Sequence, residues 1–244
     1  MTTTDTSWET HAAMLAATLT ESGDLHDPAW AAAIAATPRH RLVPIAYQQE
    51  PDGSWSQIDT TGAEGLALVY SLTTLVTEVD TEGRAVSSST KPDLMVRMLE
   101  TLDVHDGHRV LEIGTGTGYN AVLLAHRLGE ANVFSVDVDT NLITAAMKRL
   151  ADIGCHPRLA ARDGINGWPE RGPYQRIIVT CAVPRIPWAW AQQLLGRHSA
   201  RRFQSRHRCR QPRLTPPIRR PVGGPIYRAV GSVHGYAPQR RHHP

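Results

Sequence analysis

The sequence lacks long apolar runs: none reaches about 18 consecutive apolar residues, roughly the minimum for a membrane-spanning helix. Its first residues, MTTTDTSWET, also lack the basic segment followed by an apolar segment that marks a secretory signal. We therefore expect a cytoplasmic protein without a membrane partner.

Cysteine is scarce and metal-binding patterns are missing. The three cysteines, Cys155, Cys181 and Cys209, include no C-x-x-C pair, which argues against a disulfide framework and a structural zinc site. The twelve histidines include no His-Glu-x-x-His set, so no metal site is predicted. We expect ordinary reduced thiols that pack as small hydrophobic side chains.

Acidic residues are absent after Glu170. Residues 1–195 carry a net charge of −9, whereas residues 196–244 contain 12 arginines and no acid, for a net charge of +12. Such a basic segment is typical of chains that bind nucleic acid or anionic membranes. Aromatic residues are sparse there, so no base-stacking platform is evident, and a nucleic-acid-binding protein stays a disfavoured alternative.

Strands and helices alternate from residue 92 onward. Helices are predicted over 92–102, 118–129, 140–154 and 186–195, and strands over 108–114, 132–139, 157–163 and 174–183. This alternation predicts right-handed crossovers and an α/β fold with a parallel, doubly wound sheet. Upstream, helices are predicted over 7–20 and 27–37, the latter capped by Asp27, and irregular strands and loops over 45–88, with a turn at Asp52-Gly53.

A glycine-rich loop joins the first parallel strand to the next helix, in the run Glu-Ile-Gly-Thr-Gly-Thr-Gly-Tyr over 112–119. Glycines there allow a tight turn and close approach of a ligand to the backbone. A dinucleotide fingerprint counted from Gly114 puts Tyr119 where a small third glycine is needed, which disfavours a nicotinamide-dependent oxidoreductase, although that class stays open.

The same loop has the Glu-x-Gly-x-Gly-x-Gly shape of class I methyltransferases, which bind S-adenosyl-L-methionine. Asp137 ends the next strand, 23 residues after Gly114, where a carboxylate can accept both ribose hydroxyls. Asp163-Gly164 follows the third strand and is placed to border the adenine. Each feature also has an ordinary reading as a turn or a helix cap. The predicted cofactor-binding residues are Glu112, Gly114, Thr115, Gly116, Gly118, Tyr119, Asp137, Val138, Asp163 and Gly164.

Longer motifs in the same order carry a family resemblance. VLEIGTGTGYNAVLLA, SVDVD and RDGINGWPERGPYQRIIVTCAV resemble the protein-L-isoaspartate O-methyltransferases, as do the upstream TPRHRLVP and SSSTKPDLMVRMLE. The resemblance runs from about residue 37 to about 195. It implies a Rossmann-like class I methyltransferase fold and methyl transfer from S-adenosyl-L-methionine to an isoaspartyl or aspartyl carboxylate of a protein or peptide.

A narrower resemblance suggests a different acceptor. SSSTKPDLMVRMLE, Asp137 and the TCAVP run are similar to actinobacterial members that accompany an ATP-grasp peptide maturase and methylate a ribosomally made precursor peptide. Both readings share cofactor and chemistry.

The implied chemistry needs no general base, because a carboxylate with a pKa near ~3.9 is already ionised at neutral pH. The absence of an evident Ser-His-Asp or Cys-His arrangement fits this. Ser89 and Thr90 are the predicted catalytic residues, which would hydrogen-bond the acceptor carboxylate, with helix capping as their alternative role. Trp168 is predicted to pack rather than to contact a ligand.

The resemblance stops near residue 195, where GRHSARRFQSRHRCRQPRL shows neither strand alternation nor helical periodicity. We interpret residues 1–88 as a substrate-side region, 89–195 as the cofactor-binding core and 196–244 as an aberrant basic tail. Suitable codons for the tail can encode a family-like ending in a neighbouring frame, which suggests a frameshift and the loss of the last strands. Sequencing the gene tests this hypothesis.

Overall fold

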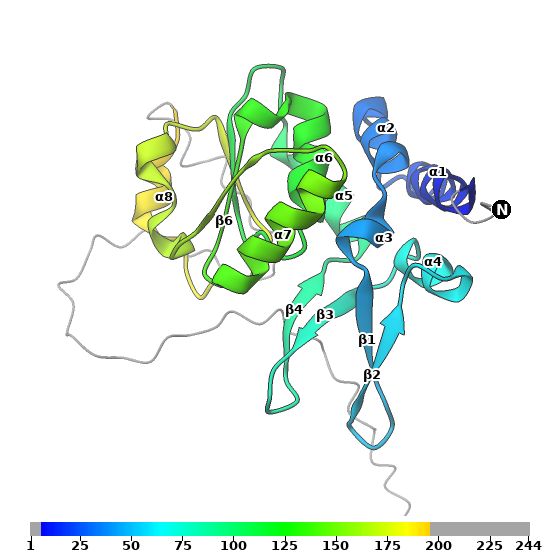
Figure 1. Cartoon of the computed structure of the whole chain (residues 1–244). Helices are drawn as coiled ribbons and strands as arrows, with labels where there is room; N and C mark the ends of the chain where they lie inside the picture. Colours follow the sequence, from blue (N-terminus) through cyan, green and yellow to red (C-terminus); the bar gives the residue numbers. More distant parts are fainter. Residues whose placement is uncertain (1–5, 196–244) are drawn as a thin grey trace, which may run out of the picture.

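The fold is built on a parallel sheet, described in a computed structural model that covers residues 6–195 (Figure 1). Its strands are β5 (Val110–Ile113), β6 (Val133–Asp137), β7 (Arg158–Ala161) and β8 (Arg176–Val179), in the order β7-β6-β5-β8. All neighbouring pairs in it are parallel. The predicted doubly wound α/β fold is therefore confirmed, and β5 lies where the strand order reverses.

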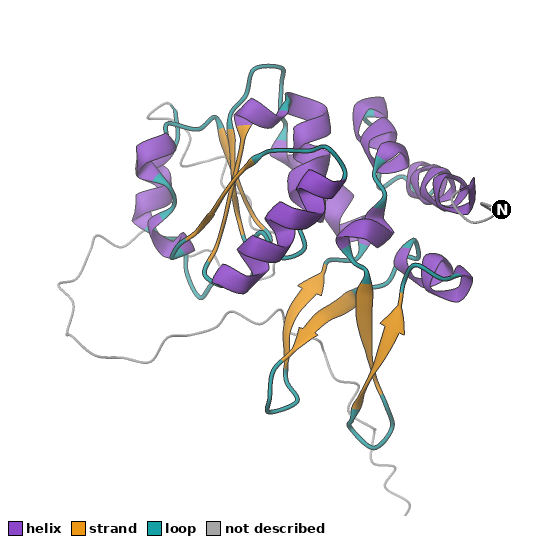
Figure 2. Ribbon diagram, viewed as in Figure 1, coloured by secondary structure: helices purple, strands orange, loops and turns teal. Residues whose placement is uncertain are grey.

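Helices flank this sheet on both faces (Figure 2). The connections contain α6 (Tyr119–Leu128), η1 (Glu130–Asn132), α7 (Thr140–Asp152), η2 (Gly164–Asn166) and η3 (Pro169–Arg171), and α8 (Trp188–Gln193) follows β8. Successive strand residues point to opposite faces. Val110 and Val133 accordingly join the cluster that includes α6 and α7, whereas Leu111 and Phe134 pack with Trp190 of α8.

The N-terminal helices share the core with the sheet. They are α1 (Thr6–Glu21), α2 (Pro28–Ala36) and the short α3 (Arg39–Leu42), and α5 (Pro92–Leu102) leads into β5. As predicted, Asp27 caps α2 by accepting a hydrogen bond from Ala29 N at 2.8 Å. One hydrophobic cluster runs from Ala12 of α1 to Ile178 of β8 without a break at the expected boundary near residue 88.

Residues 45–89 form an antiparallel sheet that extends away from the parallel one (Figure 1). It contains β1 (Ile45–Gln49), β2 (Trp55–Asp59), β3 (Leu75–Val79) and β4 (Ala85–Ser89), in the order β2-β1-β3-β4, with α4 (Ala63–Val69) between its two hairpins. The predicted turn is confirmed, with Gly53 at a φ of +87°. The expected irregular strands are thus an ordered sheet, although the β3–β4 register is interrupted.

The last described residues pair with the segment just before β8. Tyr174 N donates to Gln193 O and Leu195 N donates to Tyr174 O, both at 2.8 Å, forming a parallel bridge on the side of the chain opposite β5. The predicted basic tail, its Cys209 and the proposed frameshift lie outside the described residues.

Candidate active site

The glycine loop after β5 has a backbone that only glycine adopts readily at several positions. Gly114, Gly116 and Gly118 have φ values of +102°, +52° and +87°. A methyl group on Gly114 would lie 2.8 Å from Thr180 Oγ1, whereas one on Gly116 would have nothing nearer than Ser87 Oγ at 4.0 Å. The loop is therefore packed tightly at its start and open at Gly116, where a ligand can approach the backbone.

The adjoining strand ends hold the start of this loop in place. Gly114 N donates to Val136 O of β6 at 2.8 Å. On the other side, Thr180 Oγ1 donates to Gly114 O at 2.6 Å. The loop thus lies across the carboxyl ends of β6 and β8, at the switch point where doubly wound sheets bind nucleotides.

Asp137 points toward the loop, as the cofactor hypothesis requires. Its Oδ2 accepts a hydrogen bond from Gly116 N at 3.0 Å, and its Oδ1 accepts one from Asp139 N at 3.1 Å. Asp139, not Asp137, caps α7. Asp137 is half-buried and a carboxylate offers about four lone-pair sites, so acceptor capacity remains for ribose hydroxyls.

A buried polar chain supports the loop from below. Glu112 is fully buried and accepts hydrogen bonds from Ser135 Oγ at 2.6 Å and Asn120 Nδ2 at 2.7 Å. The Ser135 hydroxyl is also hydrogen-bonded to Thr115 Oγ1 at 2.6 Å. Burial raises the pKa of Glu112 from its ordinary 4.5 to about 7. Glu112 and Thr115 therefore shape the loop from inside the protein.

Ser89 and Thr90 lie where β4 meets the core, near the loop. Arg39 Nη2 donates to Ser89 Oγ at 3.1 Å and to Thr90 O at 3.3 Å. Neither residue caps α5, whose N-cap position is Lys91 without a side-chain cap bond. The alternative role of helix capping is therefore wrong for both residues, and their predicted role toward an acceptor stays a prediction.

The predicted adenine border is more exposed. Asp163 caps η2 by accepting a hydrogen bond from Ile165 N at 3.0 Å, so it has the helix-capping role given as the alternative to a cofactor contact. A methyl group on Gly164 would lie 2.7 Å from Ile113 Cγ2, so this glycine lets η2 approach β5. Val138 follows β6 and is 59% exposed.

Several side chains singled out in the sequence have structural roles. Trp168 packs edge-on against Phe134, with ring centroids 6.0 Å apart, as predicted. Cys155 is buried and Cys181 half-buried, and burial raises the pKa of each thiol to about 11, which makes both poor nucleophiles. Residues 6–195 contain no group of three or more His, Cys, Asp or Glu side chains that could hold a metal ion. In the same range, no helix is long and apolar enough to cross a membrane.

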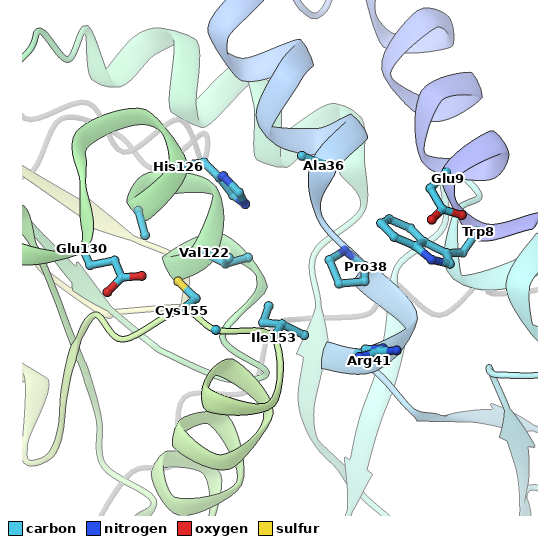
Figure 3. Close-up of a pocket in the computed structure, with 12 residues that line it drawn as sticks. Trp8, Glu9, Ala36, Pro38, Arg41, Val122, His126, Glu130, Ile153 and Cys155 are labelled. Atoms are coloured by element: carbon cyan, nitrogen blue, oxygen red, sulfur yellow. The ribbon is translucent and has the colours of Figure 1, made fainter. Parts of the chain in front are cut away.

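A cleft of about 410 Å³ lies elsewhere, between the N-terminal helices and the side of the core formed by α6 and α7 (Figure 3). Trp8, Pro38, His126 and Cys155 are among its lining residues. It contains none of the predicted site residues, so the cofactor hypothesis rests on the loop and its neighbours.

Sequence reasoning missed four residues that shape the site: Ser135, Asn120, Thr180 and Arg39. Ser135 is on β6, and alternate residues of a strand point to the same side of the sheet. It therefore shares a side with Val133 and Asp137, and this period of two could have identified it from the sequence. Arg39 lies in the TPRHRLVP segment that carried part of the resemblance, but nothing in that segment shows what its side chain contacts.

Comparison with known proteins places this geometry in a family. A family model described as protein-L-isoaspartate(D-aspartate) O-methyltransferase (PCMT) matches residues 10–197. The protein-L-isoaspartate O-methyltransferase of Anaeromyxobacter dehalogenans is 42% identical over 106 residues, which are 43% of this chain and 50% of that protein. That of Brucella anthropi is 38% identical over 105 residues, again 43% of this chain and 48% of the other.

Solved structures agree. One protein-L-isoaspartate O-methyltransferase is 30% identical with a TM-score of 0.60, over 74% of this chain and 51% of that one. A Plasmodium falciparum structure in complex with S-adenosyl-L-homocysteine is 14% identical with a TM-score of 0.55, over 75% and 79%, and supports the fold alone. The chain spans about half the length of the curated relatives it matches. Since the family model covers most of the sequence, the chain belongs to the protein-L-isoaspartate(D-aspartate) O-methyltransferase family.

Proposed function

We propose that the chain transfers a methyl group from S-adenosyl-L-methionine to the carboxylate of an L-isoaspartyl or aspartyl residue in a protein or peptide. The observation that carries this proposal is the hydrogen bond from Gly116 N to Asp137 Oδ2, which holds the carboxylate that would bind the ribose against an open glycine loop. The strand that ends at Ser89 also approaches this loop, since Ser87 Oγ lies 4.0 Å from a methyl group placed on Gly116.

The cofactor fits the residues present. The open face of Gly116 leaves room for the amino-acid arm, Asp137 would bind the ribose, and Val138, Asp163 and Gly164 would border the adenine. Tyr119 supports this cofactor over a dinucleotide, because a bulky buried side chain, 3% exposed, stands at the position where a dinucleotide fold needs a small residue.

When bound, S-adenosyl-L-methionine supplies an electrophilic methyl group on a sulfonium. A carboxylate oxygen forms the new bond to the methyl carbon as the carbon–sulfur bond breaks, which gives a methyl ester and S-adenosyl-L-homocysteine. No proton moves, because the acceptor is already ionised. The chain therefore has to orient the acceptor and exclude water, and Ser89 and Thr90 are the residues that we propose to orient it.

Calorimetry with the full chain tests the cofactor. S-adenosyl-L-homocysteine should bind and NADH should not, and binding of NADH alone would overturn the assignment. Methyl transfer to an isoaspartyl peptide, compared with a matched aspartyl peptide, then tests the acceptor. A steep salt dependence of RNA or DNA affinity, with no methyl transfer, would favour the nucleic-acid alternative.

A second acceptor is a dedicated precursor peptide, methylated in a system with an ATP-grasp peptide maturase. The resemblance of the SSSTKPDLMVRMLE segment to members that accompany such a maturase supports it. Methylation of one such peptide, with isoaspartyl proteins left unmodified, would favour this acceptor over damaged protein.

A further inference from the structure

Arg39 is a buried cation with no role in the methyl transfer proposed above. It is 0% exposed on α3, and its Cζ lies 4.9 Å from the centre of the Tyr119 ring. Only Nη2 has hydrogen-bond partners within residues 6–195, namely Ser89 Oγ and Thr90 O, while Nε and Nη1 have none. Its guanidinium therefore joins the predicted acceptor segment to the first residue of α6.

This arrangement is energetically expensive unless an anion compensates the charge. An unpaired buried charge costs several kcal/mol, and a hydrophobic side chain of similar size would fill the space at lower cost. In the described part of the chain, no carboxylate forms an ion pair with Arg39, and the groups that interact with its charge are the phenols of Tyr119 and Tyr70. The phenols carry no charge at neutral pH, so the positive charge is not neutralised by the protein residues described.

The bond to Ser89 also fixes what that hydroxyl can do. A serine hydroxyl has one proton and two lone pairs. Because Arg39 Nη2 occupies a lone pair, and because no described residue accepts the Ser89 proton, the hydroxyl is left as a donor. A donor backed by a positive charge selects an anionic partner over a neutral one.

We propose that Arg39 is a positioning residue that makes Ser89 a donor for an anionic acceptor, so that the site binds a carboxylate in preference to the corresponding carboxamide. This inference rests on the proposed function and names the feature that recognises its substrate class. Arg39 acts through Ser89 and is not itself expected to touch the acceptor.

The test measures peptide binding by calorimetry on the full chain saturated with S-adenosyl-L-homocysteine. Two peptides differ only in an isoaspartyl carboxylate or its carboxamide. The Arg39→Met variant should bind the carboxylate peptide about tenfold more weakly and the carboxamide peptide with unchanged affinity. Arg39→Lys, which keeps the charge, should recover part of the loss. Arg41→Met, on the same short helix but exposed, is the matched control.

A merely structural role predicts a different pattern. Equal losses for both peptides, or weaker binding of S-adenosyl-L-homocysteine, would overturn the proposal. If Arg39→Met does not fold, Ser89→Ala takes its place and should lose the same carboxylate preference. Methyl transfer by the wild-type chain separates the two proposals. Transfer without a carboxylate preference in binding overturns the role of Arg39 alone, whereas absence of transfer overturns the proposed function and this inference with it.

Discussion

Replacing Glu112 with glutamine should remove a large part of the pH dependence of stability. Burial raises the pKa of Glu112 from 4.5 to about 7 in the folded chain, so the folded state binds this proton more tightly than the unfolded state does. The stabilisation is complete below pH 4.5 and is lost as the pH rises to about 7. At ~1.4 kcal/mol per pH unit, this interval corresponds to about 3–4 kcal/mol.

The assay is urea unfolding followed by circular dichroism at pH 5 and pH 8. Between these values, the wild-type free energy of unfolding should fall by about 2–3 kcal/mol more than that of Glu112→Gln. The variant should fold, because Asn120 Oδ1 is buried without a partner and can accept from the new amide once the asparagine side chain turns over. Glu64→Gln, at an exposed position, is the control. Identical pH dependence in wild type and Glu112→Gln would refute the assignment of the titration to Glu112.

Three further substitutions test the site and its support. Gly114→Ala should weaken binding of S-adenosyl-L-homocysteine and lower stability by about 1–3 kcal/mol in urea, because of its positive φ and the contact with Thr180. Asp137→Asn should raise the calorimetric Kd for the same ligand about tenfold or more, measured at a temperature at which the variant is fully folded because the amide loses one of the two backbone hydrogen bonds that the carboxylate accepts, and wild-type affinity would contradict the ribose role. Trp190→Phe should cost about 2–3 kcal/mol, since it loses a 2.7 Å hydrogen bond to Gly164 O and buried volume, and a cost near zero would show that the core around α8 is loosely packed.

Local chemistry was enough to predict the parallel core. Short apolar strands, helical periodicity and a glycine loop between them are properties of neighbouring residues, and they indicated the parallel, doubly wound sheet and the place of Asp137 at a strand end. The antiparallel sheet was harder to predict. Its strands alternate poorly between buried and exposed residues, its β3–β4 register is interrupted, and β1 pairs with β3 across α4.

By itself, the sequence determined the fold class, the glycine loop and the family, because each depends on residues close together in the chain. Only the tertiary structure decided that the hydroxyl of Ser89 meets the guanidinium of Arg39, 50 residues away, and that Glu112 is buried in a polar chain. Both contacts arise where separate elements pack, and local sequence patterns do not show how far apart such elements lie in the fold. The contacts on which the proposed carboxylate preference rests are therefore set by packing.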